Sequence, residues 1–390
     1  MRKVLLAVGV LVAAAQPAYA SQPIVLAQLE TPPLFDDEAG GNADADDPAI
    51  WVDPHRPDRS IVVATAKEGG LYSYRLDGTQ FKHVTPPSVP DHKPGRFNNV
   101  DIVGDLAIVS DRGNDKVRFY RAGDLADVTA PDVPWVFNTS QSEVDEQRTV
   151  YGLAAWSDPF DRSTYVVVSR RETTRVALLK VEKHGSKYGY RVVRTLDLPG
   201  RFTLPNGAKW SPCDEPGVGP QVEGMVVDWR TGTLYAGQED VGIWRLSARL
   251  TGQPMLVDKV REFGVPGTYD PSTEECVPGQ DPGFGGKHIS ADVEGLTIHY
   301  GQNLLLASSQ GDNTFAAYRL PGVYKGSFHI GDGKTDSVEE SDGAAVSGAY
   351  LGPRFPNGLL AVQDGHNAGE PRDSTNFKFV RWDDVVHAIR

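Results

Sequence analysis

Short clusters of carboxylates and amides recur along the chain, each directly before an apolar segment. The run Asp44-Ala45-Asp46-Asp47 comes first, and Glu223 and Glu294 stand at the start of later segments of the same kind. Oxygen ligands suit hard cations, and a flexible cage of many oxygens favours calcium over magnesium. The recurrence predicts calcium sites, although any one acid could simply cap a strand or turn. The stretch from Asn42 begins like an EF-hand loop but fails that motif, because Asp47 stands where the loop needs glycine.

The charge balance narrows the partners and the chemistry. A formal net charge of -13 argues against nucleic acid or an anionic membrane as the main partner. The chain lacks the motifs Gly-x-Ser-x-Gly and His-Glu-x-x-His, a complete P-loop and an Arg-His-Gly triplet. No covalent nucleophile is evident. What remains is water activated by metal, attacking a phosphorus whose oxygens are neutralised by calcium and by Lys and Arg side chains.

Six similar units must position these residues. Each unit has a polar start, an apolar strand, a turn, a second apolar strand and a third, partly alternating strand, with Gly, Pro, Asn and Asp between them. No long amphipathic helix competes. We therefore predict an all-β, six-bladed β-propeller rather than a pair of β-sandwiches. The first strands begin near Asp47, Asn99, Tyr151, Glu223, Glu294 and Asp342.

The predicted topology has a functional corollary. An antiparallel hairpin returns the chain to the face where it started, so the start of each first strand and the end of each second strand share one face. Carboxylates from the strand starts would then meet cationic groups from the strand ends, such as Lys67 and Arg112, around one mouth of the central channel.

The amino terminus has the pattern of a secretory signal. Arg2 and Lys3 precede a short apolar run, and Ala18-Tyr19-Ala20 fits signal-peptidase cleavage. We expect residues 1–20 to be a cleaved signal peptide and residues 21–390 to be a single domain, secreted or periplasmic, without a membrane anchor and monomeric. Cys213 and Cys276 could form a disulfide in an oxidising compartment, but the sequence does not decide this.

In this order along the chain, several segments resemble the signature segments of one family, the β-propeller phytases. Each short match alone is weak, but together they span essentially the whole mature chain. They include Asp46-Asp47-Pro48-Ala49-Ile50-Trp51, Asn98-Asn99-Val100-Asp101-Ile102, Val222-Glu223-Gly224-Met225, Asp292-Val293-Glu294-Gly295-Leu296-Thr297 and Ser341-Asp342-Gly343. The resemblance implies a six-bladed, calcium-dependent enzyme that hydrolyses myo-inositol hexakisphosphate (phytate) and lower inositol phosphates, by a 3-phytase reaction with several calcium ions.

Residue roles follow from this resemblance and from the acidic signature segments. Lys67, Arg112, Tyr151 and Arg171 are assigned to gripping substrate phosphates and to catalysis, with Glu172 orienting one of them. The sequence departs from the family pattern where Glu68 follows Lys67 and where Arg171 replaces a lysine. The assigned metal ligands are Asp46, Asp47, Asp101, Glu223, Glu239, Asp292, Glu294, Gln310 and Asp342.

Two other functions are compatible with the fold. A calcium-stabilised propeller could serve as a binding module without catalysis, since fold alone does not fix function. A metal-dependent lactonase is a second alternative. The cationic residues Lys67, Arg112 and Arg171 count against the lactonase, because a neutral lactone has no phosphate group for cationic side chains to bind.

Overall fold

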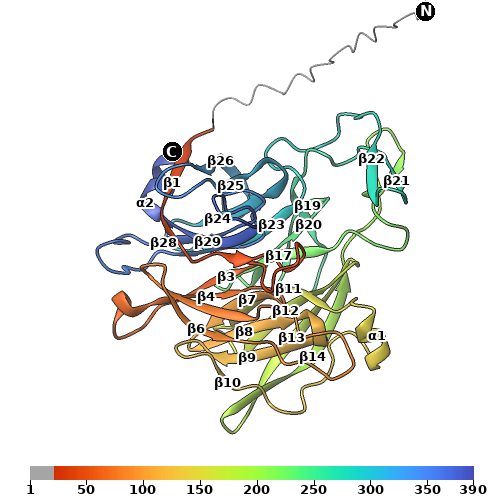
Figure 1. The fold of residues 1–390 in the computed structure, drawn as a ribbon. Coiled ribbons are helices and arrows are strands. Elements are labelled where there is room, and N and C mark those ends of the chain that lie inside the picture. The colour runs from red at the N-terminus through yellow and green to blue at the C-terminus, as the bar shows by residue number, and fades with distance from the viewer. Residues whose placement is uncertain (1–21) are drawn as a thin grey trace, which may run out of the picture.

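Each predicted repeat forms an antiparallel sheet in the computed structural model, which describes residues 22–390. The runs of Val, Ile, Leu and Ala are buried on both faces, as expected of strands packed between neighbouring sheets. Figure 1 shows these sheets arranged around a common centre. The first, second and third predicted strands of all six units are present.

The first three sheets follow the chain order. They are β3 (Pro48–Trp51), β4 (Ile61–Thr65), β5 (Leu71–Arg75) and β6 (Gln80–Val84); β7 (Phe97–Val103), β8 (Leu106–Asp111), β9 (Lys116–Arg121) and β10 (Ala126–Asp127); and β11 (Val150–Ser157), β12 (Thr164–Arg170), β13 (Arg175–His184) and β14 (Lys187–Asp197).

The next three sheets complete the set. They are β17 (Val222–Asp228), β18 (Thr233–Gln238), β19 (Gly242–Ser247) and β20 (Met255–Lys259); β23 (Val293–His299), β24 (Leu304–Ser309), β25 (Thr314–Arg319) and β26 (Val323–Gly331); and β27 (Ala344–Ser347), β28 (Leu359–Asp364) and β29 (Ser374–Arg381), joined by β1 (Ile24–Glu30) and β2 (Leu34–Phe35).

The six innermost strands close a ring, which confirms the propeller. Among β3, β7, β11, β17, β23 and β27, each strand contacts the next and the last contacts the first. The helices are short: α1 (Gln141–Asp145), α2 (Trp382–Ala388) and the 3-10 turns η1 (Pro57–Arg59), η2 (Arg112–Asn114) and η3 (Gln310–Asp312). No helix among residues 22–390 is long and apolar enough to span a membrane. The predicted signal peptide lies outside the described residues.

The strand β1 joins the two ends of the chain. It pairs antiparallel with β29 and parallel with β26, so the amino-terminal segment supplies the outer strand of the last blade. Figure 1 shows β1 between β26 and β29, beside the carboxyl-terminal helix. The fourth strands of the other blades were not predicted, because they are more polar and exposed.

Two loops that lengthen the chain before β17 and β23 fold into an arm. They form the small hairpins β15 (Phe202–Thr203) with β16 (Lys209–Trp210), and β21 (Gly267–Asp270) with β22 (Glu275–Pro278). Cys213 and Cys276 form a disulfide with their Cα atoms 6.0 Å apart, which settles a pairing that the sequence left open. Aromatic rings at the base of the arm pack together, with the Trp210 and Phe263 ring centroids 4.6 Å apart.

A buried lysine holds the ring closure. The side chain of Lys378 in β29 is 0% exposed, and its ammonium lies 2.7 Å from Asp364 Oδ2 at the end of β28. It also donates to the carboxylate of Asp336 and the carbonyl of Ser337, and lies 4.0 Å from Glu30 of β1. One ammonium therefore links β1, β28, β29 and the β26–β27 loop.

Replacing Lys378 with methionine should lower the free energy of unfolding by about 3–5 kcal/mol, because buried carboxylates would lose their partner. Chemical denaturation would measure the change. The matched variant Lys325→Met removes an exposed lysine from the adjacent blade and should change stability by about 0.5 kcal/mol or less. Equal effects of the two substitutions would contradict this account of the closure.

Candidate metal and phosphate site

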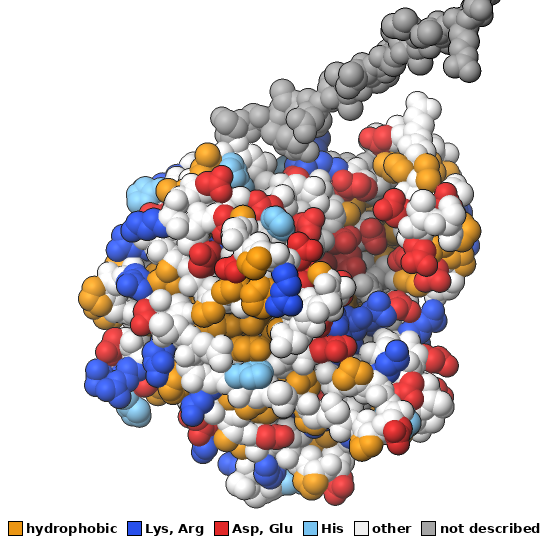
Figure 2. Space-filling view, viewed as in Figure 1, with side chains coloured by type: hydrophobic (Ala, Val, Ile, Leu, Met, Phe, Trp, Pro, Cys, Tyr) orange, Lys and Arg blue, Asp and Glu red, His pale blue; other side chains and the backbone are white. Residues whose placement is uncertain are grey.

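The starts of the inner strands and the ends of the second strands lie on one face, as the hairpin argument predicted. Acidic side chains gather in a hollow beside the arm that carries β21 and β22, and basic side chains border this hollow (Figure 2). We call this region the mouth. It contains most of the residues that the sequence singled out.

A repeated bulge turns the first side chains of the inner strands into the mouth. The pairing register shifts near the starts of β7, β11, β17 and β23. In the last three strands, the bulge contains Gly152, Gly224 or Gly295. A Cβ atom on Gly152 would lie 2.0 Å from the Glu223 carbonyl oxygen, and one on Gly224 would lie 2.2 Å from that of Glu294. Only glycine allows adjacent blades to approach this closely.

The close approach brings three glutamates together. One carboxylate oxygen from each of Glu223, Glu239 and Glu294 lies within 4.8 Å of the others, and all three residues are buried. Burial raises the pKa of Glu239 well above its usual value, with Asp292 and Glu223 adding to the effect. Burial also raises the pKa of Glu294 well above its usual value, and the negative charges of Glu223 and Glu239 add to this effect. This cluster therefore favours either protons or a cation.

Two oxygens of this glutamate cluster, Glu239 Oε1 and Glu294 Oε2, are buried and accept no hydrogen bond from any residue that the structure describes. Buried polar atoms are normally paired, so orphaned oxygens within a cluster of three carboxylates fit a bound cation. The donor set consists of oxygens alone, which suits a hard divalent ion. The predicted ligands Glu223, Glu239 and Glu294 thus meet the geometric requirement.

A second acidic group lies around Lys67. Gln310 Nε2 donates to Asp342 Oδ1 at 2.8 Å, and Lys67 Nζ lies 3.8 Å from Asp342 Oδ2 and contacts the carboxylate of Asp44. Although burial disfavours its charge, the charges of Asp342, Asp44 and Asp46 raise the pKa of Lys67 above its usual value. Burial raises the pKa of Asp342 to about 8, despite the opposing effect of Lys67. The structure brings these predicted residues together.

The guanidinium of Arg112 is connected to the glutamate cluster through Asn98. Arg112 Nη1 donates to Asn98 Oδ1 at 3.5 Å, and Asn98 Nδ2 donates to Glu223 Oε1 at 2.6 Å. The Arg112 guanidinium carbon lies 5.6 Å from the centroid of the Tyr151 ring. Burial raises the pKa of Tyr151 well above its usual value, and the negative charges of Glu223, Glu239 and Glu294 add to this effect. The hydroxyl therefore keeps its proton and stays a hydrogen-bond donor.

Arg171 and Glu172 lie in the turn after β12. The carboxylate of Glu172 accepts from Arg148 Nε at 3.0 Å and from Arg171. The backbone N–H of Glu172 donates to Gln221 Oε1 at 2.8 Å, while Gln221 Nε2 donates to Glu239 Oε2 at 2.9 Å. Gln221 therefore connects the basic side of the mouth to the glutamate cluster. The orienting role of Glu172 stays a prediction, and the contacts place its carboxylate between Arg148 and Arg171.

Asp46 and Asp292 complete the acidic side of the mouth. Asp46 is buried, and its Oδ1 accepts no hydrogen bond from the described residues. Burial, followed by the charge of Glu223, raises the pKa of Asp46 well above its usual value. Burial, together with the negative charge of Glu223, raises the pKa of Asp292 to about 6. Asp240, which the sequence assignment omitted, has its pKa raised to about 8 by burial and by Asp292.

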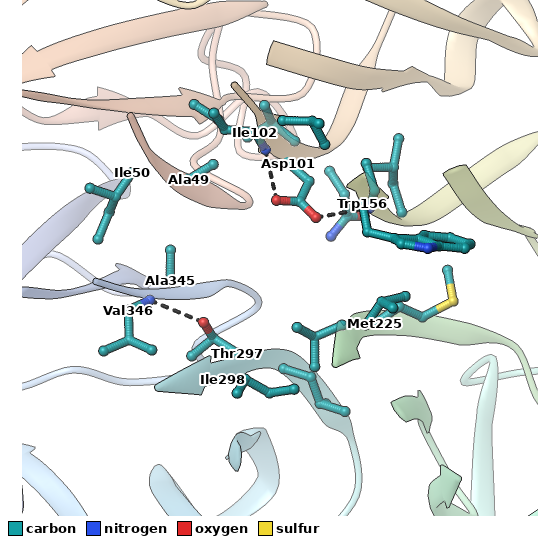
Figure 3. Close-up of a pocket in the computed structure, with 18 of the residues that line it drawn as sticks. Ala49, Ile50, Asp101, Ile102, Trp156, Met225, Thr297, Ile298, Ala345 and Val346 are labelled. Atoms are coloured by element: carbon teal, nitrogen blue, oxygen red, sulfur yellow. Dashed lines mark hydrogen bonds between the residues drawn. The ribbon is translucent and has the colours of Figure 1, made fainter. Parts of the chain in front are cut away.

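Asp47 and Asp101 line the wall of the central channel, a cavity of about 540 Å³. Asp47 Oδ2 accepts from the backbone N–H of Val100 at 3.1 Å. The two oxygens of Asp101 accept from the N–H groups of Ile102 and Ala155 at 2.7 and 2.8 Å (Figure 3). The structure does not bring Asp101 into the glutamate cluster, and its carboxylate instead joins the second blade to the third. Its predicted role as a metal ligand finds no support in these contacts.

The sequence analysis assigned no site role to Asn98, Gln221, Arg148 or Asp240. Three of them lie within two residues of positions that it did single out: Asn98 before Asn99, Gln221 before Glu223, and Asp240 after Glu239. A polar side chain next to a buried acid at a strand end was the available signal. Arg148 had no such signal, because only the folded turn brings it to Glu172.

A family model described as "Phytase" matches residues 2–117 and 274–390 of this chain. The 3-phytase of Bacillus subtilis (strain 168) is 31% identical over 389 residues, covering 94% of this chain and 85% of that protein. The chain belongs to the phytase family. Its glutamate cluster thus lies in the mouth of a phytase-family propeller, beside Arg112 and Tyr151.

Solved structures with similar backbones share little sequence with this phytase-family chain. A calcium-binding protein, regucalcin, from Agrobacterium tumefaciens has a TM-score of 0.48 and 11% identity, covering 92% of this chain and 97% of that chain. The WD40 repeats of RRP9 have a TM-score of 0.48 and 12% identity, covering 92% of this chain and 99% of that chain. The blade assignment rests on the sheets described above.

Replacing Glu294 with glutamine should raise the melting temperature of the cation-free protein, because the substitution removes one of three buried carboxylates that repel one another. It should also weaken calcium binding at the cluster by about tenfold or more, since a charged ligand is lost. Calorimetric titration and thermal denaturation with and without calcium would test both effects. Glu370→Gln, at an exposed position, is the matched control. A lower melting temperature without calcium and an unchanged affinity would contradict the assignment.

Proposed function

We propose that this protein is an exported, calcium-dependent phosphatase that releases phosphate from phytate and lower inositol phosphates. The observation that carries the proposal is the buried cluster of Glu223, Glu239 and Glu294 beside Arg112 and Tyr151. The related 3-phytase of Bacillus subtilis supports the substrate class. A cluster with orphaned carboxylate oxygens supports a hard cation, and calcium suits many flexible oxygen ligands.

The basic residues of the mouth explain how an acidic protein can hold a polyanion. Arg112 is largely buried, and its Nε has no hydrogen-bond partner among residues 22–390, so its charge is not fully satisfied by the protein. Arg171 and Lys67 are partly exposed, with side-chain exposures of 29% and 15%. Glu172 and Arg148 fix the orientation of Arg171. Such preformed donors stabilise charge on the phosphoryl oxygens without reorganising during the reaction.

The proposed reaction is an in-line displacement by water. The water oxygen forms a bond to phosphorus while the bond from phosphorus to the inositol oxygen breaks, and the inositol oxygen receives a proton. Calcium bound in the mouth would supply positive charge for the phosphoryl oxygens and lower the pKa of a water molecule. Arg112 and the protonated Tyr151 would orient the phosphoryl group, and Lys67 and Arg171 would hold neighbouring phosphates.

Phosphate release from phytate should occur with calcium and stop in excess chelator. Arg112→Gln should lower kcat by about 10²- to 10³-fold, because a preorganised donor to the transferred group is lost. Tyr151→Phe should lower kcat by a smaller factor. Arg194→Gln, an exposed arginine on β14, should behave like the unmodified protein.

The same assay separates the alternatives. Turnover that is equal with and without calcium would contradict the proposal. Calcium and phytate binding without phosphate release would indicate a binding module instead. Hydrolysis of a neutral lactone that is unaffected by Arg112→Gln would indicate a lactonase.

We also propose export through the amino-terminal signal. The Cys213–Cys276 disulfide supports an oxidising compartment, and Ala18-Tyr19-Ala20 provides a cleavage motif. Expressed in a bacterium, the full chain should be recovered outside the cytoplasm with Ser21 as its first residue. Sequencing of the amino terminus would test this, and an uncleaved cytoplasmic chain would contradict it.

A further inference from the structure

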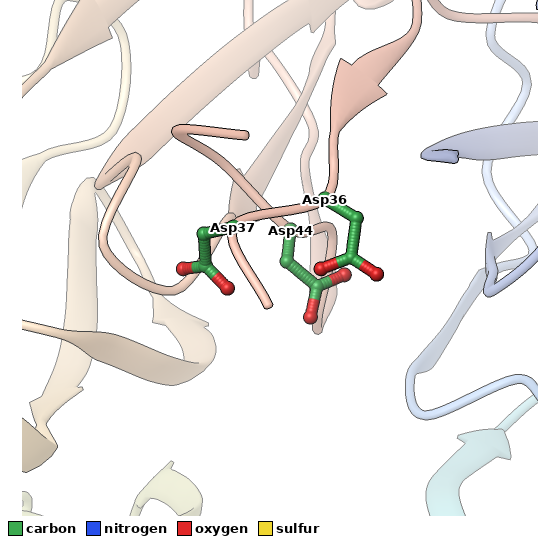
Figure 4. Close-up of side chains that lie close together, drawn as sticks. All are labelled: Asp36, Asp37 and Asp44. Carbon is green, nitrogen blue, oxygen red and sulfur yellow. The ribbon is translucent and has the colours of Figure 1, made fainter. Parts of the chain in front are cut away.

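Three aspartates outside the glutamate cluster converge on the loop that enters the first blade. Asp36 and Asp37 follow β2, and Asp44 lies further along the same loop, ahead of β3. One carboxylate oxygen from each lies within 4.8 Å of the other two. Figure 4 shows the three carboxyl groups gathered from two passes of this loop. We call them the entry-loop aspartates.

The backbone holds this arrangement. The N–H groups of Asn42 and Ala43 both donate to the Phe35 carbonyl at 3.1 Å, so the chain folds back beside its own start. A Cβ atom on Gly41 would lie 2.0 Å from that same carbonyl oxygen, so the return requires glycine. The N–H of Ala45 donates to Thr375 Oγ1 at 2.7 Å, which anchors the end of the loop on β29.

One aspartate has a buried oxygen without a partner. The side chain of Asp37 is 7% exposed, and its Oδ1 is buried with no hydrogen-bond donor in the described part of the chain, residues 22–390. Its Oδ2 accepts from Arg96 Nη1 at 3.2 Å. Asp44 is equally buried, with a side chain 7% exposed whose Oδ2 contacts Lys67. An unsatisfied, buried carboxylate oxygen is costly unless a proton or a cation completes it.

The local charges do not balance. The two cations here, Lys67 and Arg96, are outnumbered by nearby carboxylates. Arg96 lies 3.2 Å from Glu38 and 3.7 Å from Glu68, in addition to its contact with Asp37. The carboxylates around the pair are Asp36, Asp37, Glu38, Asp44 and Glu68. A divalent cation would offset most of this surplus negative charge.

We propose that Asp36, Asp37 and Asp44 form a further divalent-cation site, distinct from the glutamate cluster of the mouth. The three carboxylates supply hard oxygen ligands, with water completing the coordination, so the site would take calcium in preference to softer metals. The cation would fix the entry loop against the first blade. The cation would also share Asp44 with Lys67. An effect of this cation on phosphate binding through Lys67 rests on the proposed function.

Counting bound calcium tests the site directly. After equilibrium dialysis at one free calcium concentration, Asp36→Asn should hold one calcium fewer per chain than the unmodified protein. In the unmodified protein, the N–H of Glu38 donates to Asp36 Oδ1 at 2.7 Å. Asparagine keeps an Oδ1 atom that can accept the same hydrogen bond, so the loop turn should form in the variant. Asp91→Asn, at an exposed position, should leave the count unchanged. Equal counts in Asp36→Asn and the unmodified protein would overturn the proposal.

Hydrogen exchange localises the effect and controls for folding. Calcium should slow backbone exchange in residues 36–44 of the unmodified protein but not of Asp36→Asn, whereas residues 222–239 should be protected in both. Glu294→Gln should show the reverse pattern. If calcium leaves exchange in residues 36–44 of the unmodified protein unchanged, the site is absent. Neither measurement uses phytate, so failure of this proposal and failure of the proposed phosphatase activity are distinguishable.

Discussion

The close approach of neighbouring blades at the mouth is the constraint on which the site depends. Gly152 and Gly224 each pack against the backbone of the glutamate in the next blade, at distances that a side chain would prevent. The bulges at these positions turn Tyr151, Glu223 and Glu294 inward. Glu223 and Glu294 thereby meet Glu239, which follows β18, and the three carboxylates are buried within a few ångströms of one another. Their mutual repulsion makes the mouth a site for positive charge.

The protein neutralises buried carboxylates in two different ways. At the ring closure, the ammonium of Lys378 lies among Asp364, Asp336 and Glu30, so the charge is balanced internally. In the glutamate cluster, no lysine or arginine forms an ion pair with Glu223, Glu239 or Glu294 among the residues that the structure describes. The first arrangement stabilises the fold alone. The second leaves charge that protons or a bound cation would offset, so binding of a cation there would stabilise the mouth.

The basic groups stand at a short distance from this cluster, connected by amides. Asn98 connects Arg112 to Glu223, and Gln221 connects the Glu172 turn to Glu239. Neutral amides can donate to a carboxylate and accept from an N–H or guanidinium with one side chain. Asn98 thereby stands between the Arg112 guanidinium and the carboxylate of Glu223. Arg171 and Arg148, in contrast, pair directly with Glu172.

The sequence by itself determined the six repeats, the three inner strands of each blade and the face on which the polar residues gather. These features are local, since they depend on apolar patterning and on the return of each hairpin. Only the tertiary structure decided the Cys213–Cys276 bond, the closure by β1, the linking roles of Asn98 and Gln221 and the diversion of Asp101 to backbone amides. Each of these depends on distances between segments far apart in the chain, which no local pattern encodes.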